Sequence, residues 1–423
     1  MKPSGEASRS AFEQDYDRII FSYPFRRLQD KTQVHPLPEH DFVHTRLTHS
    51  LEVSSVGRSI GKKVGEVLMQ RWPSLGARFS LFDFGAVVAA ASLAHDLGNP
   101  PFGHAGENAI SDFFGQHPEL RGSLTDPQWA DLINFEGNAQ GFRLLNKDEF
   151  GLRLTSATLG AFTKYPCPSL VAARDKNRKS QKKFGFFESE RETFASIAAH
   201  LELLPVATNA WVRHPLAFLV EAADDICYGI IDLEDGCRLG LVSFDETLAL
   251  LAPILGNRLN LDKLNRSSGL DEKLGVLRAM TIGVLIESVT QVFLDQEAFI
   301  LNGSMDEALT DQCVYKDALR AISTTSVSRI YQSRQVVEIE AAGHEVLPGL
   351  LNEFTTAALR LMNGVRSRKF QNLALLFPEE IRHAMERDPS DRYRTFRLVV
   401  DFISGMTDRH ALSLYRKIKG ISA

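Results

Sequence analysis

Eleven uncharged residues from Phe84 to Ala94 lead directly into His95 and Asp96. The sequence Gly-Asn-Pro-Pro follows at 98–101 and ends this segment, because proline cannot continue a helix. An apolar stretch without charge is typical of a helix that is buried on all sides. We therefore predict a buried helix that ends at a histidine and an aspartate.

The His95-Asp96 pair offers one nitrogen and one oxygen ligand for a metal ion. Successive side chains of a helix project about 100° apart, so both can reach one cation only where the backbone passes close beside it. Such a site needs partners from other segments. The chain offers His49 in TRLTHSLEV and Asp224 in EAADDICYGIIDLED.

Each of these pieces alone has a more ordinary explanation. A single histidine such as His49 usually caps a helix or lies in a core, and the His95-Asp96 pair could be a charged pair stabilised by the helix dipole. Asp224 and Asp225 in an apolar helix are harder to explain. A carboxylate that faces a core is costly unless a positive charge meets it.

Helical periodicity extends over most of the chain, so we predict an all-α fold. With 423 residues the chain exceeds what one hydrophobic core usually serves. We expect either one large helical body in two lobes or two tightly fused domains. The expected parts are a core over residues 1–240 and a C-terminal helical lobe over residues 241–423.

Two kinds of segment interrupt the helical pattern. Residues 336–339 and 184–187 are the candidates for short strands. Residues 173–192 are dense in charge and predict a mobile surface loop or a flap with strands at its tip.

A second helix is well bounded by its sequence. Pro215 suits the first turn of a helix and Gly236 suits its end, so we predict a helix over residues 216–235. Asp224, Tyr228 and Asp232 are spaced four residues apart and therefore form one ridge of this helix.

The composition narrows the class of protein. A net charge of −5 and a pI near 6.2 argue against a surface dedicated to nucleic acid. The four cysteines have no CxxC spacing, which predicts reduced thiols. The N-terminus lacks an apolar signal segment, and no stretch approaches the roughly 18 apolar residues of a membrane span. We expect a soluble, cytoplasmic protein without a membrane partner.

The combination of one histidine, a His-Asp pair and a distant aspartate resembles the HD superfamily of metal-dependent phosphohydrolases. More narrowly, the chain resembles the bacterial dGTP triphosphohydrolase family. The matching motifs are FRRLQDKTQV (25–34), TRLTHSLEV (45–53), AHDLGNPPFGHAGE (94–107), FEGNAQGFR (135–143), EAADDICY (221–228) and DFISGMTDRHAL (401–412). The resemblance implies an HD-domain helical core with an additional C-terminal helical lobe.

The resemblance also implies roles for individual residues. It makes four residues ligands of a divalent metal ion, namely His49, His95, Asp96 and Asp224. It places His104, with Glu107 one turn later, beside the phosphate that is cleaved. It assigns substrate contacts to Gln33, Arg46, Asn99, Lys164, Tyr228 and Asp232, and it makes Arg278 a weaker candidate for a phosphate contact.

One motif departs from the family. Many relatives carry histidine where this chain carries Asn99. Asparagine can donate a hydrogen bond to phosphate but cannot carry a proton, so the family's division of proton transfer does not carry over directly to this chain.

By resemblance, the reaction is hydrolysis of dGTP or another dNTP to a deoxynucleoside and tripolyphosphate. The expected cofactor is Mg²⁺ or Mn²⁺, with Fe²⁺ or Ni²⁺ as alternatives, because sites of mixed nitrogen and oxygen ligands accept several metals. A second dNTP as activator and a homo-oligomer, hexamer or tetramer, are further expectations.

Two other functions fit the same residues. The first is an HD enzyme of another class, a nucleoside monophosphatase or a phosphodiesterase. The second is a nucleotide-regulated protein whose basic loop at 174–183 binds single-stranded nucleic acid weakly.

Overall fold

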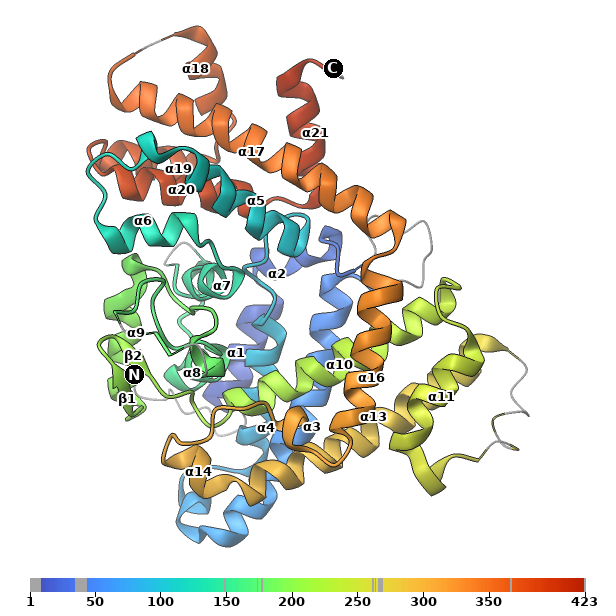
Figure 1. Ribbon diagram of the computed structural model, residues 1–423. Helices are drawn as coiled ribbons and strands as arrows, with labels where there is room; N and C mark the ends of the chain where they lie inside the picture. The colour runs from blue at the N-terminus through green and yellow to red at the C-terminus, as the bar shows by residue number, and fades with distance from the viewer. Residues whose placement is uncertain are drawn as a thin grey trace.

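The computed structural model describes all residues except 1–8, 35–43, 148–149, 173, 176–177, 261, 263, 265–268, 366 and 422–423. Helices make up nearly all of its regular structure, which confirms the predicted all-α class (Figure 1). Among the described residues, the named strands are β1 (Pro205–Ala207) and β2 (Ala210–Trp211), which form an antiparallel pair.

The helices of the first half are α1 (Ala11–Ile20), α2 (Tyr23–Arg27), α3 (Arg46–Arg71), α4 (Leu81–Ala94), α5 (Gly103–Gln116), α6 (Asp126–Ile133), α7 (Gly137–Leu145), α8 (Ser156–Phe162), α9 (Arg191–His200) and α10 (Ala217–Arg238). Those of the second half are α11 (Phe244–Leu255), α13 (Leu270–Asp295), α14 (Glu297–Leu301), α15 (Leu309–Gln312), α16 (Lys316–Thr325), α17 (Arg334–Met362), α18 (Arg368–Ala374), α19 (Glu379–Arg387), α20 (Arg392–Ser404) and α21 (Asp408–Lys419).

Helix α4 is the buried helix that the uncharged run predicts. Ser80 and Asp83 form a capping box at its start, and His95 is its C-cap residue. Residues 87–94 are all buried, because α1, α3, α8 and α10 pack around the helix. Helix α3 approaches so closely that a Cβ atom on Gly61 would lie 2.8 Å from the carbonyl oxygen of Phe84. Near the end of α4 the same helix approaches again, since a Cβ atom on Gly57 would lie 2.6 Å from Oγ of Ser92.

Helix α10 agrees with the predicted helix at 216–235 and continues to Arg238. It packs on α3, α4 and α13, and its apolar residues belong to the larger of two buried clusters. Figure 1 shows α10 crossing α3 near the middle of the molecule. The ridge that carries Asp224 therefore faces the segments that carry the two histidines.

The second buried cluster joins α5 and α6 to helices from the end of the chain. Phe114 packs against Phe396, and Phe354 packs against Phe402. In Figure 1 the long helix α17 runs over α5, and α20 lies beside α6. Each buried cluster draws on residues before and after 240, and a domain boundary at that position stays a prediction.

The two predicted short strands are absent from the described residues. Residues 336–339 belong to helix α17, where Val336 is buried and Val337 is exposed. Residues 184–187 form no strand, although Phe186 makes an isolated bridge to Pro168.

The charge-dense segment 173–192 is not simply a surface loop. Its residues 173 and 176–177 lie outside the described part. Two short 3-10 turns, at 179–181 and 188–190, and three buried phenylalanines anchor the described remainder. Burial of these apolar side chains holds the segment against the core, which the density of charged residues in its sequence does not predict.

One helix of the described chain, α13, is long and apolar enough to cross a membrane by length and composition. It packs against α3, α10 and α11, and it contributes Leu277, Val284 and Leu285 to the larger buried cluster. A packed core helix of a soluble protein meets the same criteria, so α13 is weak support for a membrane span.

Candidate active site

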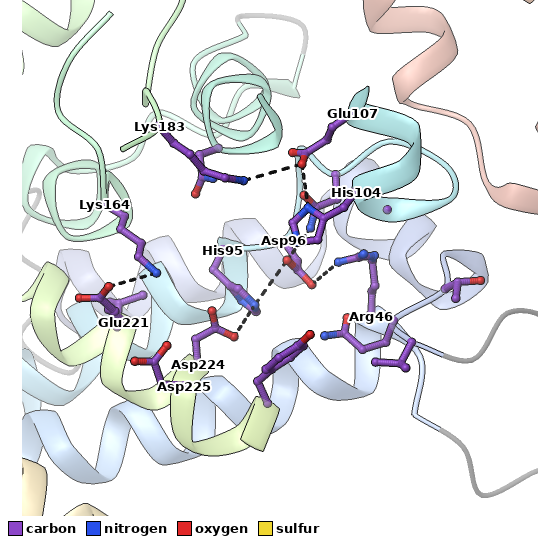
Figure 2. Close-up of a pocket in the computed structure, with 18 of the residues that line it drawn as sticks. Arg46, His95, Asp96, His104, Glu107, Lys164, Lys183, Glu221, Asp224 and Asp225 are labelled. Atoms are coloured by element: carbon purple, nitrogen blue, oxygen red, sulfur yellow. Dashed lines mark hydrogen bonds and ion pairs between the residues drawn. The ribbon is translucent and has the colours of Figure 1, made fainter. Parts of the chain in front are cut away.

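A cavity of about 550 Å³ opens where α4 ends. Its wall combines the turn after α4, the start of α5, the segment after α8, one face of α10 and the start of α17. Figure 2 shows the charged side chains of these segments pointing toward one another. Most of the residues that the sequence suggested for chemistry line this cavity.

Three potential metal ligands lie together here: His95 and Asp224 line the cavity, and the buried His49 contacts Asp224. His49, His95 and Asp224 each offer one ligand atom, and these atoms lie within 4.8 Å of one another. Oδ1 of Asp224 is 3.2 Å from Nε2 of His49 and 3.4 Å from Nε2 of His95. Helix α3 supplies the first histidine, the C-cap of α4 the second, and α10 the aspartate.

A hydrogen bond fixes the orientation of the His95 ring. Its Nδ1 lies 2.7 Å from the carbonyl oxygen of Ser92 and donates to it, so Nε2 faces Asp224. Burial opposes a positive charge on this ring, but Asp96 and Asp224 outweigh burial and raise the pKa of His95 to about 9. The surroundings thus favour a positive charge between these side chains.

Asp96 lies at the edge of this group. Its Oδ1 is 3.6 Å from Nε2 of His95, and its Oδ2 accepts a hydrogen bond from Arg46 at 2.7 Å. The side-chain amide of Asn99 donates to Oδ1. Asp96 is therefore held on one side by a guanidinium and on the other by an amide.

His104 and Glu107 form a hydrogen-bonded pair on the opposite wall. Nδ1 of His104 lies 2.8 Å from Oε2 of Glu107, whose Oε1 accepts from the backbone N–H of Gly137 at 2.7 Å. The His104 side chain is 78% exposed, whereas that of Glu107 is 9% exposed. The hydrogen bond to Glu107 raises the pKa of His104. The imidazole therefore projects into the cavity from a carboxylate fixed beneath it.

Two lysines face the cavity from a third side, and each has a carboxylate partner. Nζ of Lys164 is 3.2 Å from Oε1 of Glu221 (Figure 2), and Nζ of Lys183 is 3.0 Å from Oε1 of Glu136. Burial opposes the charge of Lys164, but Glu221 outweighs it and raises the pKa of this lysine. Both side chains are cationic at neutral pH.

The predicted ridge of α10 divides between the cavity and the core. Asp224 and Tyr228 line the cavity, but Asp232 is buried outside its lining. Oδ2 of Asp232 accepts a hydrogen bond of 2.7 Å from the hydroxyl of Tyr331, and the Tyr331 ring lies 5.4 Å from that of Tyr228. Burial raises the pKa of Asp232 to about 8.

The remaining candidates divide in the same way. Gln33 lines the cavity, and its buried Oε1 accepts no hydrogen bond from the described residues. Arg278 is not brought to the cavity. Its guanidinium pairs with Glu234 at 2.9 Å instead.

Comparison with known proteins places this site in a family. The HD domain family matches residues 46–124, and the phosphohydrolase-associated domain family matches residues 309–417. A deoxyguanosinetriphosphate triphosphohydrolase-like protein of Synechocystis is 42% identical over 98% of this chain and 94% of its own length. A protein of the same description from Pseudomonas aeruginosa is 41% identical over 99% of this chain and 95% of its own length.

The chain belongs to the dGTP triphosphohydrolase-like family of HD-domain proteins. A deoxyguanosinetriphosphate triphosphohydrolase of Salmonella paratyphi A is 32% identical over 97% of this chain and 94% of its own length. Family membership makes the chain a phosphohydrolase, in agreement with the resemblance of its motifs.

HD domains are metal-dependent phosphohydrolases, and the donor set of this chain suits a divalent ion. Two imidazole nitrogens and one carboxylate oxygen converge, and mixed nitrogen and oxygen sets suit first-row divalent metals. His95 is further oriented by its hydrogen bond to Ser92, as is usual for ligating histidines. His49, His95 and Asp224 would hold the ion, with Asp96 as the nearest further carboxylate.

Lys183, Tyr331 and Glu221 are among the cavity residues that were not found from the sequence. Lys183 is one of several lysines in the charge-dense segment, and no pattern distinguishes it from the others. Tyr331 comes from a distant segment without a recognisable motif. Glu221 could have been found, because it precedes Asp224 by three residues, about one helical turn, and so lies next to the ridge already identified.

Proposed function

We propose that this phosphohydrolase hydrolyses deoxynucleoside triphosphates, dGTP among them, to a deoxynucleoside and tripolyphosphate with the help of a divalent metal ion. In this reaction water adds to the α-phosphorus and the bond from that phosphorus to the 5′-oxygen breaks. A proton leaves the water, and the 5′-oxygen gains one.

One observation carries the proposal. Two of the three potential metal ligands, the His104–Glu107 pair and two cationic lysines line one cavity, and the third ligand, His49, contacts Asp224 at its wall. A bound divalent ion would offset the charge that develops on the phosphate oxygens. Transfer of a phosphoryl group depends mainly on such positioning and charge stabilisation.

The residues of the chain divide the remaining work. His104 moves a proton at Nε2, because Glu107 occupies its Nδ1. Arg46, Lys164 and Lys183 bind phosphate oxygens. Tyr228 packs on the deoxyribose, and Gln33 offers its unpartnered buried oxygen to the 3′-hydroxyl.

The test is a screen of the four dNTPs against Mg²⁺, Mn²⁺, Fe²⁺ and Ni²⁺, with and without a second dNTP, in which tripolyphosphate is measured. The His104→Ala variant is the control for contaminating hydrolases. Release of tripolyphosphate by the wild type alone supports the proposal. Release of orthophosphate from nucleoside monophosphates, without tripolyphosphate from any dNTP, would assign the chain to another class of HD enzyme.

A further inference from the structure

A single buried carboxylate at the wall of the cavity contacts three cations. The side chain of Glu221 has no exposed surface, and its Oε2 accepts a hydrogen bond of 2.6 Å from Arg213. Its Oε1 lies 3.2 Å from Nζ of Lys164 and 3.6 Å from Nζ of Lys179. Burial opposes ionisation, but these cations outweigh it and lower the pKa of Glu221 to about 2.

The three cations do not depend on Glu221 equally. Arg213 also lies 3.5 Å from a carboxylate oxygen of Asp306, and Lys179 lies 3.1 Å from one of Asp311. Among the described residues, Lys164 has no second carboxylate within 4.0 Å. Its place therefore depends on Glu221 far more than the places of the other two cations do.

The contact leaves the donors of Lys164 available. Oε1 of Glu221 is buried but accepts no hydrogen bond of normal geometry, although the ammonium is only 3.2 Å away. The lysine is thus held by charge and not by a directed hydrogen bond. Its side chain lines the cavity and is 24% exposed, so its N–H groups can turn toward a ligand.

We propose that Glu221 is a positioning residue that fixes the ammonium group of Lys164 at the cavity wall for binding a triphosphate. This inference rests on the proposed function, because it names the element that prepares the phosphate-binding part of that site. Glu221 itself does not contact the substrate. Arg213 holds Glu221 in turn and links it to the carbonyl oxygens of Asp306 and Glu307.

Binding of inorganic tripolyphosphate separates positioning from charge. Removing a carboxylate near a polyanion should strengthen its binding if charge alone mattered. If Glu221 positions Lys164, Glu221→Gln should instead weaken binding about tenfold, as Lys164→Met does. In the Lys164→Met background, Glu221→Gln should then change the affinity less than about twofold. Calorimetric titration of the four proteins measures this.

A matched control lies on the same helix. Glu234 is buried on α10 and pairs with Arg238 and Arg278, but it does not line the cavity. Glu234→Gln removes a comparable buried charge and should leave tripolyphosphate affinity within about twofold of wild type. If Glu221→Gln fails to fold, Glu221→Asp keeps the charge, moves it by one methylene and should show the same coupling to Lys164.

Three outcomes would overturn the inference. They are tighter tripolyphosphate binding by Glu221→Gln, an unchanged effect of this substitution in the Lys164→Met background, and an equal loss in Glu234→Gln. Failure of the proposed function is a separate result, because it would be absence of dNTP hydrolysis by the wild type. The binding cycle remains readable in that case.

Discussion

His49 and Asp224 lie 175 positions apart in the chain, yet Nε2 of the histidine is 3.2 Å from Oδ1 of the aspartate. The approach depends on the packing of α3 against α10, and Asp224 bridges His49 to His95 on α4. The three-residue group is therefore a product of the tertiary fold. Asp224 is the residue that supplies the carboxylate shared by both imidazoles.

Replacing Asp224 by alanine should abolish retention of a divalent metal, because it removes the anionic ligand shared by both histidines. Metal content by elemental analysis after gel filtration measures this. The adjacent Asp225 accepts a hydrogen bond from Thr310 and serves as the control, so Asp225→Asn should keep the metal. Equal metal content in wild type and Asp224→Ala would contradict the ligand assignment.

The His104–Glu107 pair predicts a displaced pH profile. The hydrogen bond to Glu107 raises the pKa of His104, so Glu107→Gln should lower that pKa toward the usual value near 6.5. The limb of the kcat/KM profile that reports His104 should then move to lower pH, whether the imidazole acts as acid or as base. Hydrolysis rates measured between pH 5 and about pH 9 test this.

His104→Ala is the companion variant. Loss of a general acid or base slows turnover by about 10²–10⁴-fold. The limb of the kcat/KM profile that moves in Glu107→Gln should be absent from the pH profile of the residual activity of His104→Ala. A limb that persists in His104→Ala would have to belong to another group.

The sequence predicts the site better where a motif spans several turns than where the fold brings single residues together. His95 and Asp96 end a helix whose uncharged run is readable, and the spacing of Asp224 and Tyr228 on α10 places both in the cavity. Asp232 shares that spacing but is buried, because Tyr331, 99 positions later, donates to its carboxylate. No local pattern carries this contact.

The same limit applies to secondary structure. Val336 and Val337 favour a strand by their β-branched side chains, but they begin the 29-residue helix α17. Tertiary contacts of α17 with α5, α18 and α20 outweigh the local preference.

A buried ion pair between the two halves of the chain predicts a pH-dependent stability. Asp401 on α20 accepts hydrogen bonds from Arg143 at 2.9 Å and pairs with Lys147 at 2.9 Å. Burial opposes its charge, but these cations outweigh it and hold the pKa of Asp401 far below its usual range. Asp401→Asn should lower the free energy of unfolding at pH 7 by about 3 kcal/mol, because it takes the carboxylate partner from Lys147 and leaves Arg143 with Glu190 alone.

The sign of the pH dependence follows from the depressed pKa. The contribution of Asp401 is complete above the unfolded-state pKa of about 3.9 and is lost as the pH falls toward the folded-state pKa. The difference between wild type and variant in urea denaturation should therefore shrink below about pH 4. Glu192→Gln is the surface control, because that side chain is 94% exposed. A difference that stays constant down to pH 3 would contradict the assignment.

Tyr228 predicts how the proposed enzyme rejects ribonucleotides. Its ring lines the cavity one turn after Asp224, is 40% exposed and is supported by Tyr331. A ring packed on the sugar would leave no room for a 2′-hydroxyl, so wild type should hydrolyse dGTP far faster than GTP.

Tyr228→Ala should reduce the ratio of kcat/KM for dGTP to that for GTP by about 10-fold or more. Much of this change should come from a higher kcat/KM for GTP, because the 2′-hydroxyl is no longer excluded. Competition assays with both nucleotides in one reaction measure this ratio directly. Leu239, the C-cap residue of α10, lies outside the cavity lining, and Leu239→Ala serves as the control that leaves the ratio unchanged. An unaltered ratio in Tyr228→Ala would move the discrimination to other residues of the cavity.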